Sequence, residues 1–266
     1  ATGNDDDYVL SGTGVDNIDT DNGRDVIQSG AGADKLLTGN DNDLLDAGDG
    51  NDTITAGAGE DWIAAGKGAD IIDGGGNDRN LLAFNRGDGA DVVSNSFWGN
   101  DTVSLGHGIR YADLKLAKSG NDLVLVMGEG DAMTFKNWYT NSQNRGIGRV
   151  QVVTVGGDYD AASSDVTRNK QVELFDFTKL VQKFDAARAA NASQASGWSV
   201  MNSLLDVHLS GSDTKAMGGD LSFQYATTGS LSGIGLVAAQ ASLAGGSSLQ
   251  TLKPRSQLEG GTAWLS

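Results

Sequence analysis

The sequence predicts a mainly β protein in which a stack of short coils is followed by a β-rich region and a partly helical C-terminal region. Three observations lead to this prediction. A nine-residue unit repeats without interruption from residue 2 to residue 73. Glycine contributes 39 of 266 residues, which is typical of turn-rich or repetitive architectures. Short alternating runs separated by turn residues follow the repeats.

The repeat unit has two constant features. Its sixth position is aspartate in all eight units, and its eighth position is aliphatic in all eight. A fixed period of this kind indicates stacked supersecondary units. The aspartates are Asp7, Asp16, Asp25, Asp34, Asp43, Asp52, Asp61 and Asp70, and the aliphatic residues are Val9, Ile18, Ile27, Leu36, Leu45, Ile54, Ile63 and Ile72.

The composition of the unit predicts its backbone. Positions one to six are rich in Gly, Asn and Asp and should form a turn, whereas positions seven to nine should form a short strand whose middle side chain points inward. Two units then close one coil every 18 residues, so that alternate aspartates stack along two opposite edges. Asp5 and Asp41 replace glycine at the fourth position. Aspartate tolerates a left-handed backbone, so we expect weaker rather than broken coils there.

The charge distribution predicts a partner for these aspartates. Of the net charge of −16, residues 1–80 carry −14 and residues 81–266 carry −2. Such an acidic segment repels nucleic acid and anionic membranes but attracts cations. Three-residue strands also bury too little apolar surface to order the glycines unaided. Carboxylates and turn carbonyls offer oxygen ligands only, which suit Ca²⁺ better than Mg²⁺, zinc or copper. Three gaps on each edge predict about six ions or more.

Two other interpretations of this region are disfavoured. A disordered acidic tract would not require a strict aliphatic column. An EF-hand within DNDLLDAGDGNDT fails because Leu44 and Leu45 occupy positions that need oxygen ligands or the glycine turn.

The unit resembles the RTX nonapeptide G-G-x-G-x-D-x-U-x of haemolysin-type calcium-binding proteins, which bacteria export by type I secretion. The resemblance implies a right-handed parallel β-roll with bound calcium. It implies ligands from the eight sixth-position aspartates and from backbone oxygens of the turn glycines. These glycines are Gly12, Gly14, Gly23, Gly30, Gly32, Gly39, Gly48, Gly50, Gly57, Gly59, Gly66 and Gly68.

The segment GGGNDRNLLAFNRGDGADVVS at 74–94 is similar to the irregular last coils of such a roll. We expect one residue to be missing after Gly75, which would shift the register. Asp78, Asp88 and Asp91 are further candidate metal ligands in this segment.

Residues 100–139 predict several short strands, with SGND and GEGD as hairpin turns. This region is similar to the cap that follows the last repeat block in large RTX cytotoxins, particularly the adenylate cyclase toxin family. A cap would cover the open end of the roll. Trp98, Phe135, Trp138 and Tyr139 are predicted to form the core of this cap rather than a ligand site.

Two helices are predicted after the cap. Leu174, Phe177, Val181 and Phe184 recur at spacings of three and four, which predicts an amphipathic helix over roughly 170–190 that packs on the cap. SVMNSLLDVHL at 199–209 predicts a second helix. The Gly-, Ser-, Ala- and Leu-rich tail from residue 229 is similar to the export signal of type I substrates. The predicted regions are therefore 1–80, the calcium-binding roll, 81–162, the last coils and cap, and 163–266, the helical and secretion-signal region.

No catalytic constellation is recognised, so we predict that this chain is not an enzyme. The sequence has no HExxH motif, and GSLSG at 229–233 has leucine where a nucleophilic serine would stand. His107 and His208 are predicted to be structural or surface residues. The absence of cysteine excludes disulfides and thiolate metal sites.

The sequence thus predicts a calcium-binding module at the C-terminus of a secreted bacterial exoprotein, unfolded in low calcium for export and folded by extracellular calcium. The resemblance implies type I export from a Gram-negative bacterium, with the secretion apparatus as a partner of the C-terminal tail. We expect the parent to be a toxin. The alternatives are an adhesin or surface-layer protein and a hydrolase with an upstream catalytic domain. We expect no nucleic-acid partner, and contact with a host membrane or receptor only through an upstream part.

Overall fold

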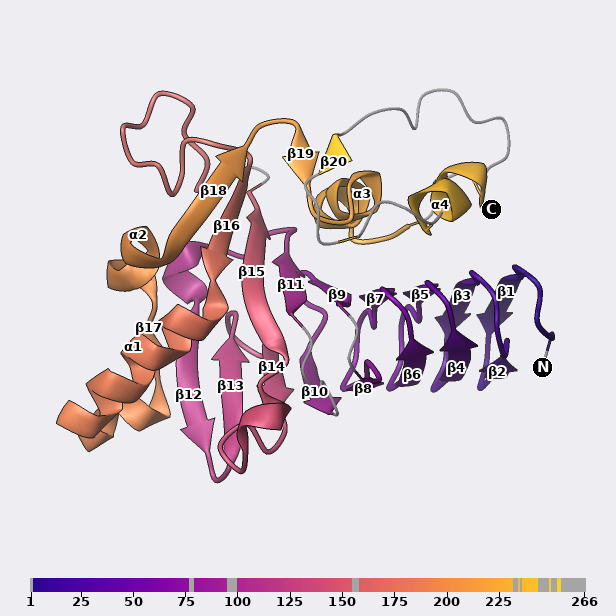
Figure 1. Ribbon diagram of the computed structural model, residues 1–266, viewed down its shortest axis with the longest axis horizontal. Helices are drawn as coiled ribbons and strands as arrows, with labels where there is room; N and C mark the ends of the chain where they lie inside the picture. Colours follow the sequence, from indigo (N-terminus) through magenta and orange to yellow (C-terminus); the bar gives the residue numbers. More distant parts are fainter. Residues whose placement is uncertain are drawn as a thin grey trace.

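The computed structural model describes residues 2–76, 79–94, 100–154, 158–231, 234, 236–243, 249 and 253–254. Two long β-sheets face each other across most of the molecule. Figure 1 shows the N-terminal repeats as an elongated stack that continues into a wider β-rich body. The predicted fold class is confirmed: the protein is mainly β and contains a parallel β-solenoid of about 5 turns.

Each long sheet has nine strands. In spatial order, sheet A consists of β1 (Tyr8–Thr13), β3 (Val26–Ala31), β5 (Leu44–Asp46), β7 (Trp62–Ala64), β9 (Leu81–Phe84), β11 (Asp101–Leu105), β15 (Ile147–Val153), β16 (Val172–Asp176) and β18 (His208–Ser212). Sheet B consists of β17 (Trp198–Ser199), β12 (Lys115–Ser119), β13 (Asp122–Val126), β14 (Ala132–Phe135), β10 (Ala90–Ser94), β8 (Ile71–Asp73), β6 (Thr53–Ala58), β4 (Lys35–Asn40) and β2 (Asn17–Asp19). β19 (Lys215–Ala216) and β20 (Lys253–Pro254) form a separate short pair.

The repeats alternate between the two sheets, as the unit predicts. Ile27 pairs with Leu45 and Leu45 with Ile63 in sheet A, each one coil apart. Leu36 pairs with Ile54 in the same way in sheet B. All these pairs are parallel, and their side chains are buried between the sheets because they occupy the inward-facing position of a strand.

The first irregular coil is one residue longer than the regular coils. The prediction that a residue is missing after Gly75 is therefore wrong. Leu82 pairs with Ile63 across the sheet. Asp61 and Asn80 occupy equivalent positions in successive coils and are 19 residues apart, whereas equivalent positions of regular coils are 18 residues apart. The extra residue lies in the turn, because the inward-facing aliphatic side chain determines the pairing register of the strand.

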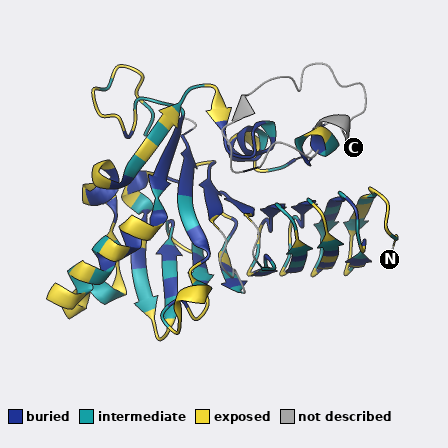
Figure 2. Cartoon of the chain, viewed as in Figure 1, coloured by how far each residue is buried: buried dark blue, intermediate teal, exposed yellow. Residues whose placement is uncertain are grey.

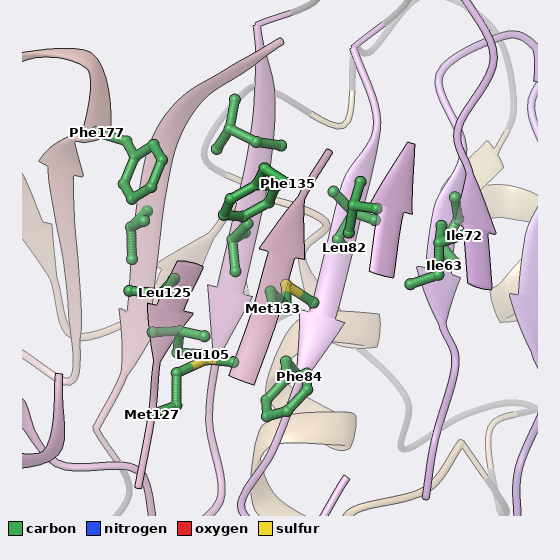
Figure 3. Close-up of a cluster of buried hydrophobic side chains, with 14 of the residues drawn as sticks. Ile63, Ile72, Leu82, Phe84, Leu105, Leu125, Met127, Met133, Phe135 and Phe177 are labelled. Carbon is green, nitrogen blue, oxygen red and sulfur yellow. The ribbon is translucent and has the colours of Figure 1, made fainter. Parts of the chain in front are cut away.

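Both sheets continue from the roll into the cap without interruption. β14 pairs parallel with β10, and β15 pairs parallel with β11. The predicted hairpin turns SGND and GEGD connect β12 to β13 and β13 to β14, which are antiparallel neighbours. Figure 3 shows Ile63 and Ile72 of the roll lying in line with Leu82, Phe84 and side chains of the cap. One hydrophobic core therefore extends through both parts.

The first predicted helix begins later than expected. Residues 172–176 form strand β16, and helix α1 spans Phe177–Ala190. The carboxylate of Asp176 accepts the backbone N–H of Lys179 at 2.9 Å and caps the helix. α1 buries Phe177, Leu180, Val181 and Phe184 against the core, as its periodicity predicts.

The second predicted helix is shorter than expected and only partly α-helical. Within 199–209 only the short 3-10 turn η4 (Met201–Ser203) and helix α2 (Leu204–Val207) form, and His208 begins strand β18. The remaining 3-10 turns are η1 (Tyr111–Asp113), η2 (Ser142–Asn144) and η3 (Ala192–Ser196).

Two further helices, α3 (Asp220–Thr228) and α4 (Leu236–Leu243), lie over the outer face of sheet A (Figure 1). They cover a column of outward-facing apolar side chains in the roll: Val26, Leu44, Trp62 and Leu81. Figure 2 shows the exposed positions that remain on the roll. On sheet B the equivalent Ile71 is 49% exposed.

Several sequence predictions lie outside the described residues, namely Asp78, Trp98 and most of the tail from residue 229. In the described ranges, no helix is both long and apolar enough to cross a membrane.

Candidate metal centre

Two ladders of aspartates run along the two edges of the roll. In each ladder the backbone N–H of one aspartate donates to Oδ1 of the aspartate one coil later. The distances are 2.8 Å from Asp7 to Asp25, 2.8 Å from Asp25 to Asp43 and 2.9 Å from Asp43 to Asp61. On the other edge they are 2.9 Å from Asp16 to Asp34, 2.7 Å from Asp34 to Asp52 and 2.7 Å from Asp52 to Asp70. The sixth positions thus stack as the repeat predicts.

The second carboxylate oxygen of these residues is buried without a hydrogen-bond partner in the described part of the chain. This holds for Oδ2 of Asp7, Asp25, Asp34, Asp43, Asp52 and Asp70. A buried charged oxygen without a partner is costly, because it has lost its hydration and gained nothing in exchange. A proton or a cation at Oδ2 would remove this cost, and one cation can bind oxygens of two successive coils.

Burial changes the acidity of the ladder. It raises the pKa of Asp43 to about 8, that of Asp70 to about 7 and that of Asp52 to about 6, and it also raises the pKa of Asp25. The backbone N–H groups that donate to these carboxylates oppose the shift without cancelling it. The folded roll therefore favours carboxylates that are neutralised.

The turn glycines bring backbone carbonyls into close contact between coils. Gly32 has a φ of +147°, and a Cβ built on it would lie 1.5 Å from the carbonyl oxygen of Gly14. At Gly30 the equivalent contact with Gly12 is 2.0 Å. All twelve glycines predicted as backbone ligands have positive φ. The turns can stack this closely only because these positions lack a side chain.

Aspartate replaces glycine in three of these turns. Asp41 adopts a left-handed φ of 79°, as expected, and so does Asp21 at a second position, with a φ of 64°. Asp5 is not among the described residues with positive φ. Short polar side chains tolerate this conformation better than most residues do.

The structure reveals contacts between coils that the sequence analysis did not recognise. At the fifth position, Asp6, Asn42 and Asn51 accept the backbone N–H of the residue one coil later at 2.8–2.9 Å. At the first position, the hydroxyls of Ser29 and Thr38 donate to the first-position carbonyl one coil later. These contacts could have been predicted from the recurrence of Asn at the fifth position and of Ser or Thr at the first position of the unit.

The ladders extend beyond the regular repeats. Asp91 accepts the N–H of Asp70 at 3.1 Å and continues the second ladder, and burial raises its pKa to about 8. Asp101 and Asn80 continue the first ladder, which the sequence analysis missed.

Asp88 belongs to neither ladder. Its Oδ2 accepts the N–H of Asn85 at 2.7 Å and the hydroxyl of Tyr225 at 3.0 Å. Burial raises its pKa to about 7. It lies beneath helix α3 and attaches that helix to the roll.

The donor set limits which ion could bind. In the described ranges, no point brings together three or more His, Cys, Asp or Glu side chains. An ion on a ladder would therefore take its remaining ligands from backbone carbonyls and water. Such an oxygen-rich, flexible set fits Ca²⁺.

The two histidines lie away from the ladders. Nδ1 of His107 lies 3.3 Å from the carbonyl of Thr227, and Nε2 of His208 lies 2.7 Å from the buried carboxylate of Glu173. His208 thus begins strand β18 and does not belong to a helix.

A family model described as the RTX calcium-binding nonapeptide repeat (4 copies) matches residues 10–45 and 46–81. The two matches cover most of the roll, including its first irregular turn. No curated protein matches the chain. The RTX repeat is a structural calcium-binding module and not a catalytic family.

Proposed function

Because the chain is an RTX repeat protein with a β-solenoid, we propose that its roll binds Ca²⁺ between successive coils and needs the ion in order to fold. The observation that carries this proposal is the row of buried Oδ2 atoms without hydrogen-bond partners in the described ladders. The sixth-position aspartates and the turn carbonyls would hold the ions, about six or more in number.

Calcium would couple to folding through charge. Residues 1–80 carry a net charge of −14, so without a cation the stacked carboxylates repel one another. The sites do not exist in the unfolded chain, so the free energy of binding becomes free energy of folding. A low-calcium compartment would thus keep the roll unfolded, and millimolar calcium would fold it.

This coupling suits a secreted protein. RTX repeats are typical of secreted proteins. We propose that the module is exported unfolded by a type I apparatus that recognises the C-terminal tail and that it folds outside the cell. The parent would be an exoprotein, most simply a toxin, and the three predicted regions would act as roll, cap and secretion region.

The proposal is tested by far-UV circular dichroism of the chain during a calcium titration from metal-stripped buffer to about 10 mM, with Mg²⁺ in parallel. We expect a cooperative gain of β-signal with Ca²⁺ alone. A β-signal that is already complete without metal would overturn the calcium-dependent folding step.

Asp52→Ala should raise the calcium concentration at the folding midpoint by at least roughly threefold, because it removes one ligand and weakens both adjacent gaps. The same titration measures this shift. Asp19→Ala is the matched control, since it removes an equal charge from a ninth position outside the ladder. Equal midpoints for the two variants would contradict the assignment of the ladder as the ion site.

A further inference from the structure

One position in the first ladder differs from all the others. Where the regular coils have aspartate, the first irregular coil has Asn80, which is 3% exposed. Its Oδ1 accepts the N–H of Asp61 at 2.8 Å, and its own N–H donates to Oδ1 of Asp101 at 2.8 Å. Asn80 therefore continues the ladder and fills the same structural position as the aspartates.

The difference lies in the second side-chain atom. Nδ2 of Asn80 donates to the carbonyl of Gly74 at 2.7 Å. In the described part of the chain, by contrast, Oδ2 of Asp25 and of Asp43 has no hydrogen-bond partner. The orientation of the amide follows from its partners, because a backbone N–H can only donate and a carbonyl can only accept. Asn80 thus contains the donor that its aspartate counterparts lack.

This arrangement does not fit a calcium ion. The amide group is neutral, and its Nδ2 is not a ligand for Ca²⁺, which binds oxygen. The carbonyl of Gly74 already accepts a hydrogen bond from this group. A Cβ built on Gly74 would lie 3.0 Å from Nδ2, so the turn is closely packed against the amide.

We infer that the amide of Asn80 replaces a bound calcium ion and closes the coil at the junction of roll and cap without metal. This inference rests on the proposed function, since it assigns one ladder position to a hydrogen bond where that function assigns the others to ions. The second edge has Asp91 at the corresponding junction and keeps its carboxylate. The two edges therefore differ in where their ion sites end.

The test compares Asn80→Asp with the wild-type chain by counting bound calcium in equilibrium dialysis of the full 266-residue protein against CaCl₂. The aspartate would place a second acceptor opposite the Gly74 carbonyl and recreate the partnerless oxygen. We expect one additional calcium ion per chain. Asn51→Asp is the matched control, because Asn51 is exposed and Oδ1 can still accept the N–H of Ala69, so the ion count should not change.

Asn80→Ala provides an independent test that needs no new site. It should leave the ion count unchanged and lower the melting temperature in saturating calcium, because the Gly74 carbonyl loses its donor. A loss of one ion would identify Asn80 as a ligand and overturn the inference. So would an unchanged count in Asn80→Asp beside a wild-type chain that binds calcium. A wild-type chain that binds no calcium at all would instead overturn the proposed function.

Discussion

At the scale of the residue, the two oxygens of a sixth-position aspartate have different roles. Oδ1 accepts a backbone N–H from the neighbouring coil, a contact that an amide can make equally well, as Asn80 does. Oδ2 is buried at Asp25, Asp43 and Asp52 and has no hydrogen-bond partner among the residues that the structure describes. The aspartate at these positions is therefore explained by what binds Oδ2 and not by the stacking of the coils.

The raised pKa values of the ladder carboxylates predict a pH dependence for the calcium-free chain. The pKa of Asp52 is raised to about 6 and that of Asp43 to about 8, from an ordinary value of 3.8. The folded state therefore binds protons more tightly than the unfolded state, so lowering the pH from 8 to 5 should increase the free energy of unfolding. Far-UV circular dichroism in metal-stripped buffers between pH 8 and pH 5 measures this as a gain of folded β-signal at the lower pH.

Calcium binding to the folded chain should have the opposite pH dependence. Protons compete with the ion for the same oxygens, so the calcium affinity of the folded chain, measured by equilibrium dialysis, should fall as the pH falls. A loss of β-signal from the calcium-free chain as the pH falls from 8 to 5 would contradict the prediction that the ladder carboxylates are buried without partners.

Gly32→Ala tests the close stacking of the turns. The added Cβ would lie 1.5 Å from the Gly14 carbonyl oxygen, so coils must move apart. Gly14→Ala is the control, because Gly14 also has a positive φ, of +132°, but nothing lies within 4 Å of a Cβ there. We expect Gly32→Ala to cost at least about 2 kcal/mol more than the control. Urea unfolding in saturating calcium measures the difference, and equal costs would contradict the stacking.

At the scale of the element, the two sheets of the roll differ in what covers them. The outward residues Val26, Leu44 and Trp62 of sheet A are apolar and buried beneath α3 and α4. The equivalent Ile71 of sheet B is half-exposed. Trp62 is the central residue of the covered column. Its ring meets Tyr225 edge-on at 5.6 Å, and its Nε1 donates to the hydroxyl of Ser222 at 3.3 Å. The C-terminal helices therefore dock on a surface that only the folded roll presents.

Trp62→Ala should cost about 3–5 kcal/mol of unfolding free energy and expose the C-terminal helices to protease, because it leaves a cavity beneath α3. Limited proteolysis in saturating calcium, followed by mass spectrometry, detects the exposed segment. Ile71→Ala changes the equivalent position of sheet B and should cost less than about 1 kcal/mol. Cleavage at the same rate in both variants would count against docking through Trp62.

At the scale of the whole molecule, the order of the units decides which residues face the C-terminal helices. Alternate units enter alternate sheets, so an even number of units can be removed without exchanging the faces. Removal of an odd number moves every unit on the N-terminal side of the deletion into the opposite sheet.

Deletion of residues 29–46 removes two units and should keep a cooperative, calcium-dependent fold with about two fewer ions. Deletion of residues 38–46 alone should bring Lys35 beneath the C-terminal helices in place of Leu44, and burying that charge should displace them. Equilibrium dialysis and limited proteolysis compare the two deletions. Intact docking in the shorter deletion would contradict the alternation.

The roll could be predicted from the sequence alone. The period of nine, the aspartate column and the aliphatic column are local and repeat eight times, so each unit supports the same conclusion about coils, inward faces and edges. The hairpins at SGND and GEGD followed for the same reason, because turn chemistry is local.

The remaining features depend on contacts between residues that are distant in the sequence. Residues 172–176 have helical spacing, but Val172 and Phe175 are buried in a strand between β15 and β18. The docking of α3 on Trp62 joins residues 160 positions apart, and no local pattern encodes such a pairing. The place of Asn80 in the ladder depended on an extra turn residue that hides it from a nine-residue alignment. In each case the deciding contact is distant in sequence, and burial against a distant partner outweighs local preference.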